Sequence, residues 1–293
     1  MLLQLLVNGL ISGCGYALVA LGFALIYGTT KTFHFAHGAV YTLSAYFLYT
    51  FYNLWKFPLS LAIVLSLFLT AIIGILVDEL IYLPLDKKGS SPLIRMLSSL
   101  GLYIIMINFV AMIYGNETKV LNPSIQPTYH IGSLILTRIQ AVIFLFSVLL
   151  FILLILFLRK MKAGMMIRAA RDNSRLLSVV GINPRRIRWL VFSLGSLLAG
   201  IASLLNGLDV GIDPNIGMPV FLNGAVAVII GGVGMIEGSI LGALLLGILQ
   251  SLVIWKFSAR WQDTMTFILL ILFLLFRPQG FLGVRRRIEE AST

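Results

Sequence analysis

Two histidines stand three residues apart in the stretch FHFAHG, a spacing that raises the question of metal chemistry. On a helix His34 and His37 would face the same side. A closed zinc site needs four ligands, and no cysteine or carboxylate stands at a supporting spacing. We therefore expect no metal site. Each imidazole is expected to pack at a helix break and bond a neighbouring carbonyl, with direct contact to a solute as the alternative.

The carboxylates are spread along the chain and form no catalytic pair. An enzyme would need a nucleophile with its base, or a metal cluster, in a polar cavity. No such group is evident, so we expect no catalytic residue and no cofactor. Glu237 is expected at a membrane interface or beside an arginine, because a carboxylate deep in lipid costs roughly 2.5–3.5 kcal/mol. Asp209 and Asp213 either meet a basic partner or are simply solvated.

Long apolar segments must position these residues. The 293-residue chain is 59% hydrophobic and only 11% charged, against about 25% charged residues in ordinary soluble domains. Apolar runs of about 20 residues, enough to cross a bilayer as helices, recur from end to end. The net charge of +11 is then explained by Lys and Arg in loops at the cytoplasmic face rather than by nucleic acid.

We predict an all-α polytopic membrane protein with one domain over residues 1–293 and about eight or nine transmembrane segments. The second and seventh segments are short and interrupted by glycine, so one or both are predicted to be broken or re-entrant helices. The segments lie near residues 2–28, 35–52, 58–83, 93–114, 139–158, 188–210, 216–234, 238–256 and 264–276.

The basic residues predict an orientation. If every segment crosses once, 17 of the 22 basic residues fall on the same side as the C-terminal RRR. Because Lys and Arg collect on the cytoplasmic side, the C-terminus is predicted inside and the N-terminus outside. The longest outer connection, 115–138, is either a docking rim for a soluble protein or a simple connector.

The segment 160–187 is the most polar part of the chain. MMIRAAR predicts a short helix, DNS a stop and an N-cap, and RLLSVVG a second short helix that ends at Gly181. An apolar stripe of Leu176, Leu177 and Val180 suits a helix that lies flat on the membrane or inserts into a groove of a partner. A basic loop held to anionic lipid is the alternative, and we favour docking.

Two glycine-containing interruptions, YGTTKTFHFAHGAV and IIGGVGMIEGSI, fall in the two halves of the chain. Unwound backbone inside a membrane is tolerated only where it is buried in protein or lines a cavity. We therefore predict a translocation path between the two interruptions. Its predicted residues are His34, Phe35, His37, Gly38, Asn223, Gly231, Gly232 and Gly234.

Four stretches, in order and spanning nearly the whole chain, resemble the branched-chain amino acid (Liv-type) ABC transporter permeases. They are NGLISGCGYALVALGFALIYGTTKTFHFAHGAVYTLSAY, GMMIRAARDNSRLLSVVGIN, FLNGAVAVIIGGVGMIEGSILGALLLG and FRPQGFLG. His34 departs from the family pattern, which usually has asparagine before Phe-Ala-His-Gly.

The resemblance implies a fold like that of type II ABC importer permeases and a role in the bacterial cytoplasmic membrane. A permease of this kind pairs with a second permease, identical or different, binds two cytoplasmic ATPase subunits and receives its solute, most often a branched-chain amino acid, from an extracytoplasmic binding protein. The chain has no Walker A motif, so ATP would be hydrolysed by another polypeptide.

The same resemblance implies the ATPase-coupling residues. They are Arg168, Arg171, Asp172, Asn173, Leu177, Gly181, Ile182 and Asn183. An ion-coupled carrier or channel for amino acids, urea or small amides is the alternative function. Carriers of that class tend to place ionisable residues at mid-membrane, whereas the carboxylates here flank apolar runs. They are Asp78, Glu79, Asp209, Asp213, Glu237 and Asp263.

Overall fold

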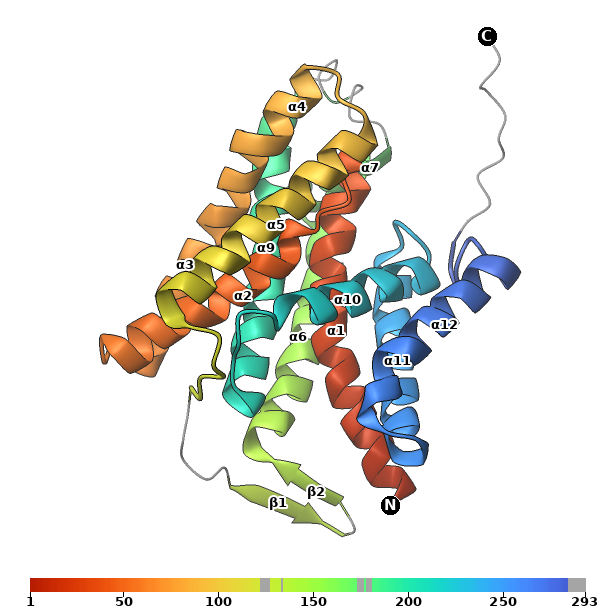
Figure 1. The fold of residues 1–293 in the computed structure, drawn as a ribbon. Helices are drawn as coiled ribbons and strands as arrows, with labels where there is room; N and C mark the ends of the chain where they lie inside the picture. The colour runs from red at the N-terminus through yellow and green to blue at the C-terminus, as the bar shows by residue number, and fades with distance from the viewer. Residues whose placement is uncertain (122–126, 133, 173–176, 178–180, 284–293) are drawn as a thin grey trace.

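The computed structural model describes residues 1–121, 127–132, 134–172, 177 and 181–283, and Figure 1 shows a bundle of tilted helices. We call its two ends the α7 end and the hairpin end, after the elements that lie there (Figure 1). The elements are α1 (Leu2–Thr30), α2 (Ala36–Leu48), a π-helical turn η1 (Tyr49–Leu54), α3 (Leu59–Val77), a π-helical turn η2 (Asp78–Tyr82), α4 (Leu83–Lys87), α5 (Pro92–Tyr114), β1 (Thr128–Ile131), β2 (Leu134–Thr137), α6 (Arg138–Lys160), α7 (Lys162–Asp172), α9 (Pro184–Val210), α10 (Gly217–Gly231), α11 (Ile236–Lys256), a 3₁₀ turn η3 (Ala259–Trp261) and α12 (Gln262–Phe276).

All nine predicted apolar segments are helical over most of their length. By length and composition, seven helical stretches of the described chain are long and apolar enough to span a membrane. The second and seventh segments are not among them, and α10 of the seventh segment is the shorter apolar helix Gly217–Gly231. At 1.5 Å per residue, the 15 residues of α10 extend only about 22 Å, less than the roughly 30 Å hydrocarbon core.

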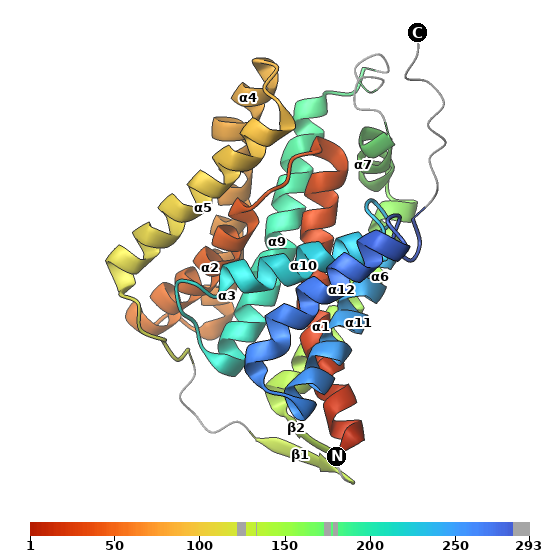
Figure 2. The same ribbon diagram turned by 45° about the vertical axis from the view of Figure 1, so that its right-hand side comes forward.

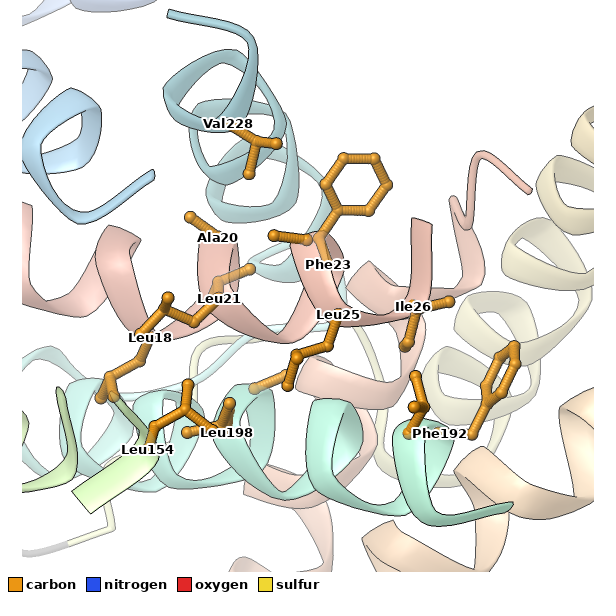
Figure 3. Packing of buried hydrophobic residues seen from close by; sticks show 14 of the residues in the cluster. Leu18, Ala20, Leu21, Phe23, Leu25, Ile26, Leu154, Phe192, Leu198 and Val228 are labelled. Carbon is orange, nitrogen blue, oxygen red and sulfur yellow. The ribbon is translucent and has the colours of Figure 1, made fainter. Parts of the chain in front are cut away.

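Helix α1 is the centre of the bundle. Every residue from Ala17 to Ile26 is buried, so this stretch is enclosed on all sides. A helix that is apolar all round is stable only when other protein or lipid surrounds it, and here the neighbours are helices. Figure 3 shows its side chains packed against three of them, through Leu154 of α6, Phe192 and Leu198 of α9, and Val228 of α10.

Small residues allow α1 to lie very close to α11. A Cβ built on Gly9 would come within 2.7 Å of the Cα of Ile248, and one on Gly13 within 2.9 Å of the Cα of Leu244. The second small pair, Gly238 and Gly242, packs in the same way against α10. Lipid tails give helices no hydrophobic reason to associate, so close backbone packing of this kind stabilises the contact.

The connection 115–138 contains a structure that the sequence did not predict. Strands β1 and β2 form an antiparallel hairpin in which Thr128 pairs with Thr137. The Gln4 side chain of α1 donates to the carbonyl of Ile135 and accepts from its N–H, both at 2.9 Å. Thr137 then caps α6 through a capping box with Gln140. The connection 115–138 is therefore partly ordered by α1 and α6.

The α1–α11 contact predicts that a side chain at Gly247 is destabilising. A Cβ at Gly247 would lie 2.5 Å from the backbone N of Gly13, so Gly247→Val should lower the free energy of unfolding in detergent by about 1–3 kcal/mol through overpacking. The matched control is Gly101→Val on α5, where a Cβ meets nothing within 4 Å. Equal melting temperatures for the two variants would contradict the close contact.

Candidate functional site

The first site feature is the break between α1 and α2. Helix α1 ends at Thr30, and Lys31 adopts a left-handed conformation with φ 54°. Residues 31–35 are not part of a helix and lead to α2, which begins at Ala36. Figures 1 and 2 show this link turning back from the α7 end into the middle of the bundle. The interruption predicted from the sequence is therefore present.

A chain of buried hydrogen bonds satisfies the broken backbone. The N–H of Ala36 donates to Ser99 Oγ of α5 at 3.0 Å, and Tyr82 OH of η2 donates to the same Oγ at 2.7 Å. His34 Nδ1 lies 2.7 Å from Tyr82 OH. Because Tyr82 uses its only proton on Ser99, Nδ1 carries the proton of the His34 bond. The sequence predicted a backbone carbonyl as the partner of His34, whereas the partner in the structure is the hydroxyl of Tyr82.

His37 and three phenylalanines pack beside this series of hydrogen bonds. His37 is fully buried, and a Cβ built on Gly22 of α1 would lie 3.0 Å from its ring. The ring of Phe35 lies 4.9 Å from that of Phe33 and 5.5 Å from that of Phe221 of α10. The predicted path residues at this break therefore form a packed layer across the middle of the bundle.

Helix α10 connects the two predicted interruptions. At one end, a Cβ on Gly38 would lie 2.9 Å from the carbonyl oxygen of Gly217, so α2 and α10 meet backbone to backbone. At the other end, a Cβ on Gly231 would lie 2.6 Å from the N of Ser239 in α11. The residues predicted to share one path therefore fall mainly into two groups, toward opposite ends of α10, which is about 22 Å long.

Asn223, the remaining predicted path residue, lies in the middle of α10 and is buried. It accepts from Gln250 of α11 at 3.1 Å, and Gln250 donates also to Thr266 of α12 at 2.7 Å. Gln262 donates to Gln250 at 2.9 Å and to Tyr16 of α1 at 3.3 Å. This polar network between four helices was not anticipated, although amides inside long apolar runs were a visible signal for it.

The second interruption is a tight turn, residues 232–235, that contacts α7. Gly232 and Gly234 have φ of 105° and 91°, which favour glycine. Arg171 of α7 donates to the carbonyl of Gly234. Glu237, in the first turn of α11, pairs with Arg159 of α6 at 2.6 Å, in agreement with the expected arginine partner. The turn is therefore tied to both α6 and α7.

Much of the segment 160–187 is described, and α7 is the first predicted short helix. Its buried face consists of Gly164, Ile167 and Ala170. Its exposed residues are Lys162, Met165, Arg168, Ala169 and Asp172, and the last four stand at i, i+3, i+4 and i+7 on one face.

Beyond α7, Leu177 is buried, and the N–H of Ile182 donates to its carbonyl at 3.0 Å around Gly181 with φ 79°. The left-handed backbone of Gly181 is a conformation that glycine favours. Asn183 caps α9 by accepting from the N–H of Arg185. Asn173 and most of the second predicted helix lie outside the described residues.

An ionic cluster that the sequence did not predict joins α9 to η2, α4 and α5. Arg188 donates to Asp78 at 2.5 Å and to Asp86 at 2.6 Å, and Arg95 also pairs with Asp86. The Asp78 side chain is fully buried. Beside the cluster is a cavity of about 520 Å³, whose lining includes Thr29, Lys31, Leu177 and Arg188. This cavity lies at the α7 end of the bundle, and we call it the vestibule.

The described residues contain no group of three or more His, Cys, Asp or Glu side chains that could hold a metal ion.

Comparison with known proteins gives a consistent result. Residues 5–274 match the family model described as "Branched-chain amino acid transport system / permease component". BraD of Pseudomonas aeruginosa, a high-affinity branched-chain amino acid transport system permease protein, is 33% identical over 98% of this chain and 97% of its own. LivH of Escherichia coli K12 is 31% identical with the same coverage. A probable LivH of Methanocaldococcus jannaschii is 28% identical over 91% of this chain and 88% of its own. Among solved structures, PsaBC from Streptococcus pneumoniae in complex with Fab aligns over 92% of this chain and 90% of that chain, with 14% identity and a TM-score of 0.49.

The hydrogen-bond chain at the break predicts that Ser99→Ala is destabilising. The substitution leaves the buried N–H of Ala36 without its acceptor, so the free energy of unfolding should fall by about 1–3 kcal/mol. Ser147→Ala is the matched control, because its buried Oγ has no partner among the described residues. Thermal unfolding in detergent measures both, and an unchanged melting temperature for Ser99→Ala would refute the role of this bond.

The ionic cluster predicts unequal effects for two arginines of α9. Arg188→Gln removes the partner of the buried Asp78 carboxylate and should lower the free energy of unfolding by about 3–5 kcal/mol. Arg185→Gln should cost much less, because Arg185 pairs with Glu79 where water screens the charges. Denaturant titration of the two purified variants compares them. Similar losses for both would mean that burial of Asp78 does not set the cost.

Proposed function

The chain belongs to the family of permease components of branched-chain amino acid transport systems, and we propose that it is one permease subunit of an ATP-driven importer for branched-chain or other small amino acids. Its partners are a second permease, cytoplasmic ATPase subunits and an extracytoplasmic binding protein. In this assembly the chain crosses the bacterial cytoplasmic membrane with the α7 end in the cytoplasm and its N-terminus outside.

The observation that carries this proposal is the exposed face of α7. Met165, Arg168, Ala169 and Asp172 stand at i, i+3, i+4 and i+7 on a helix whose opposite face is buried against the bundle. A helix that presents such a face suits a groove on a soluble partner. The face lies at the end where the positive charges of the segment 160–187 gather, so we assign it to the ATPase.

A continuous set of contacts leads from this face to the middle of the bundle. Arg171 of α7 holds the carbonyl of Gly234 in the turn before α11. Helix α10 leads from that turn to Gly217, which touches Gly38 of α2. Movement of α7 by an ATPase would therefore shift α10 and press on the broken helix, where His34, Phe35 and His37 form the packed layer.

The hairpin end is assigned to the binding protein. Strands β1 and β2 project at that end beside the N-terminus of α1 (Figure 1). The bonds from Gln4 hold the hairpin to α1. A binding protein that docks there would contact an element fixed to the central helix.

Charge reversal on α7 tests the assignment. Arg168→Asp should reduce co-purification of the ATPase subunit with the tagged chain by about tenfold or more, equivalent to 1.4 kcal/mol. The reason is that arginines covered by a partner often contribute most of the binding energy of an interface. Lys88→Asp, which makes the same charge change after α4, should retain the ATPase. The measurement is the ATPase-to-permease ratio after purification of the whole complex in mild detergent.

Two results would contradict the proposal. Failure of any ATPase to accompany the wild-type chain would reject the importer. Equal retention by Arg168→Asp and wild type would leave the importer in place and reject α7 as the ATPase contact.

A further inference from the structure

A second cavity lies in the half of the bundle toward the hairpin end. Its volume is about 140 Å³, several times the roughly 30 Å³ that one water molecule occupies in liquid, and it is lined by residues of α1, α2, α6, α9 and α10. None of the path residues predicted from the sequence lines it. Its lining joins one carboxylate, one amide, two phenols and the Ser12 hydroxyl to aliphatic walls.

The polar groups of this cavity come from α1, α2 and α9. Asp209 of α9 is partly buried and has no ion-pair partner within the part of the chain that the structure describes. One turn away, Asn206 donates to Tyr41 OH of α2 at 3.0 Å. Tyr16 of α1 accepts from Gln262 at 3.3 Å and so joins the cavity to the amide network around Gln250.

The other walls are aliphatic, from Leu18 of α1, Ile143 of α6 and Val220 of α10. Such a lining fits a molecule with a cationic group, an anionic or polar group and an aliphatic chain. The cationic group would meet Asp209, the anionic group would meet the hydroxyl and amide donors, and the chain would contact the apolar walls. Pockets of mostly apolar surface with a few placed polar groups are the usual form of small-molecule sites.

The packed layer at the break begins one helical turn from the lining of the cavity on α1 and α2. One helical turn from Tyr41 toward the centre of the bundle, α2 carries His37. One turn from Leu18 in the same direction, α1 carries Gly22, and the two meet. The cavity therefore ends where the central barrier begins, as a chamber for a waiting solute should.

We propose that this cavity is a solute-binding chamber for a zwitterionic aliphatic amino acid, and that Asp209 binds the ammonium group. The inference rests on the proposed importer function and adds to it a site and a recognition residue. It predicts that filling the cavity stops transport and that removing the charge of Asp209 weakens recognition of the ammonium group.

Gly15 provides the test, because it lines the cavity and a Cβ there meets nothing within 4 Å. The complete complex, with its ATPase, partner permease and binding protein, is reconstituted in vesicles, and uptake of labelled leucine is measured. Gly15→Leu should reduce uptake by at least about tenfold. Gly101→Leu is the control, since its added side chain also meets no neighbour. Asp209→Asn should reduce uptake by about 10- to 100-fold, the usual loss for a hydrogen bond to a charged group.

A labelling measurement decides the matter even if Gly15→Leu assembles poorly. The native Cys14 is buried and contributes little background. A membrane-impermeant thiol reagent should modify Gly15→Cys faster than Gly101→Cys, and leucine delivered by the binding protein should slow that reaction. Equal labelling of the two variants, or no effect of leucine, would overturn the chamber.

The two proposals fail in different ways. If the wild-type complex takes up leucine and Gly15→Leu or Asp209→Asn takes it up equally well, the chamber is wrong and the importer stands. If the wild-type complex hydrolyses ATP but transports no amino acid, the importer function itself fails.

Discussion

The hydrogen bond from the backbone of Ala36 to Ser99 is the constraint on which the centre of this molecule depends. A helix that starts inside a membrane exposes N–H groups that lipid cannot satisfy. Here Ser99 supplies an acceptor, and Tyr82 and His34 extend the chain. The bonds come from α5 and η2, so both elements must lie beside the break. The position of α5, which otherwise has few buried residues, follows from this requirement.

Close glycine contacts impose the second constraint. Gly38 against Gly217 and Gly231 against Gly238 fix both ends of α10 against other backbones. A displacement of a neighbouring backbone should pass directly to α10, because no long side chain lies at these glycine contacts to absorb it by a change of rotamer. The clamp from Arg171 to Gly234 adds a polar contact of fixed direction. Thus α7, α10 and α2 are mechanically one series.

The sequence predicted what its local pattern determines. Apolar runs between polar breaks located nine helical segments, and the glycines of the break and the turn marked both interruptions. The hairpin was missed because Leu134–Thr137 is only four residues long and reads as the approach to α6. The partnership of Asp78 with Arg188 was missed for another reason. It joins positions 110 residues apart, and only the tertiary fold brings them together. His34 was recognised as buried, but its partner Tyr82 lies 48 residues away.

Helix α1 separates the two cavities, and its packing limits how access could change. Five residues between Ile11 and Leu18 line the chamber toward the hairpin end, Thr29 and Lys31 line the vestibule at the α7 end, and residues 19–26 between them are buried. In that stretch a Cβ on Gly22 would lie 2.5 Å from the carbonyl of Gly195 in α9, and one on Gly224 of α10 would lie 3.2 Å from the N of Ala20. Such smooth contacts interlock fewer side chains than a core of large residues, so the steric cost of a small slide of α10 along α1 is set mainly by the close contacts at the two ends of α10. Small sliding of packed helices is a known mode of conformational change. Exchange of access between the two cavities would therefore need a shear of α10 along α1 rather than unfolding of the central helix.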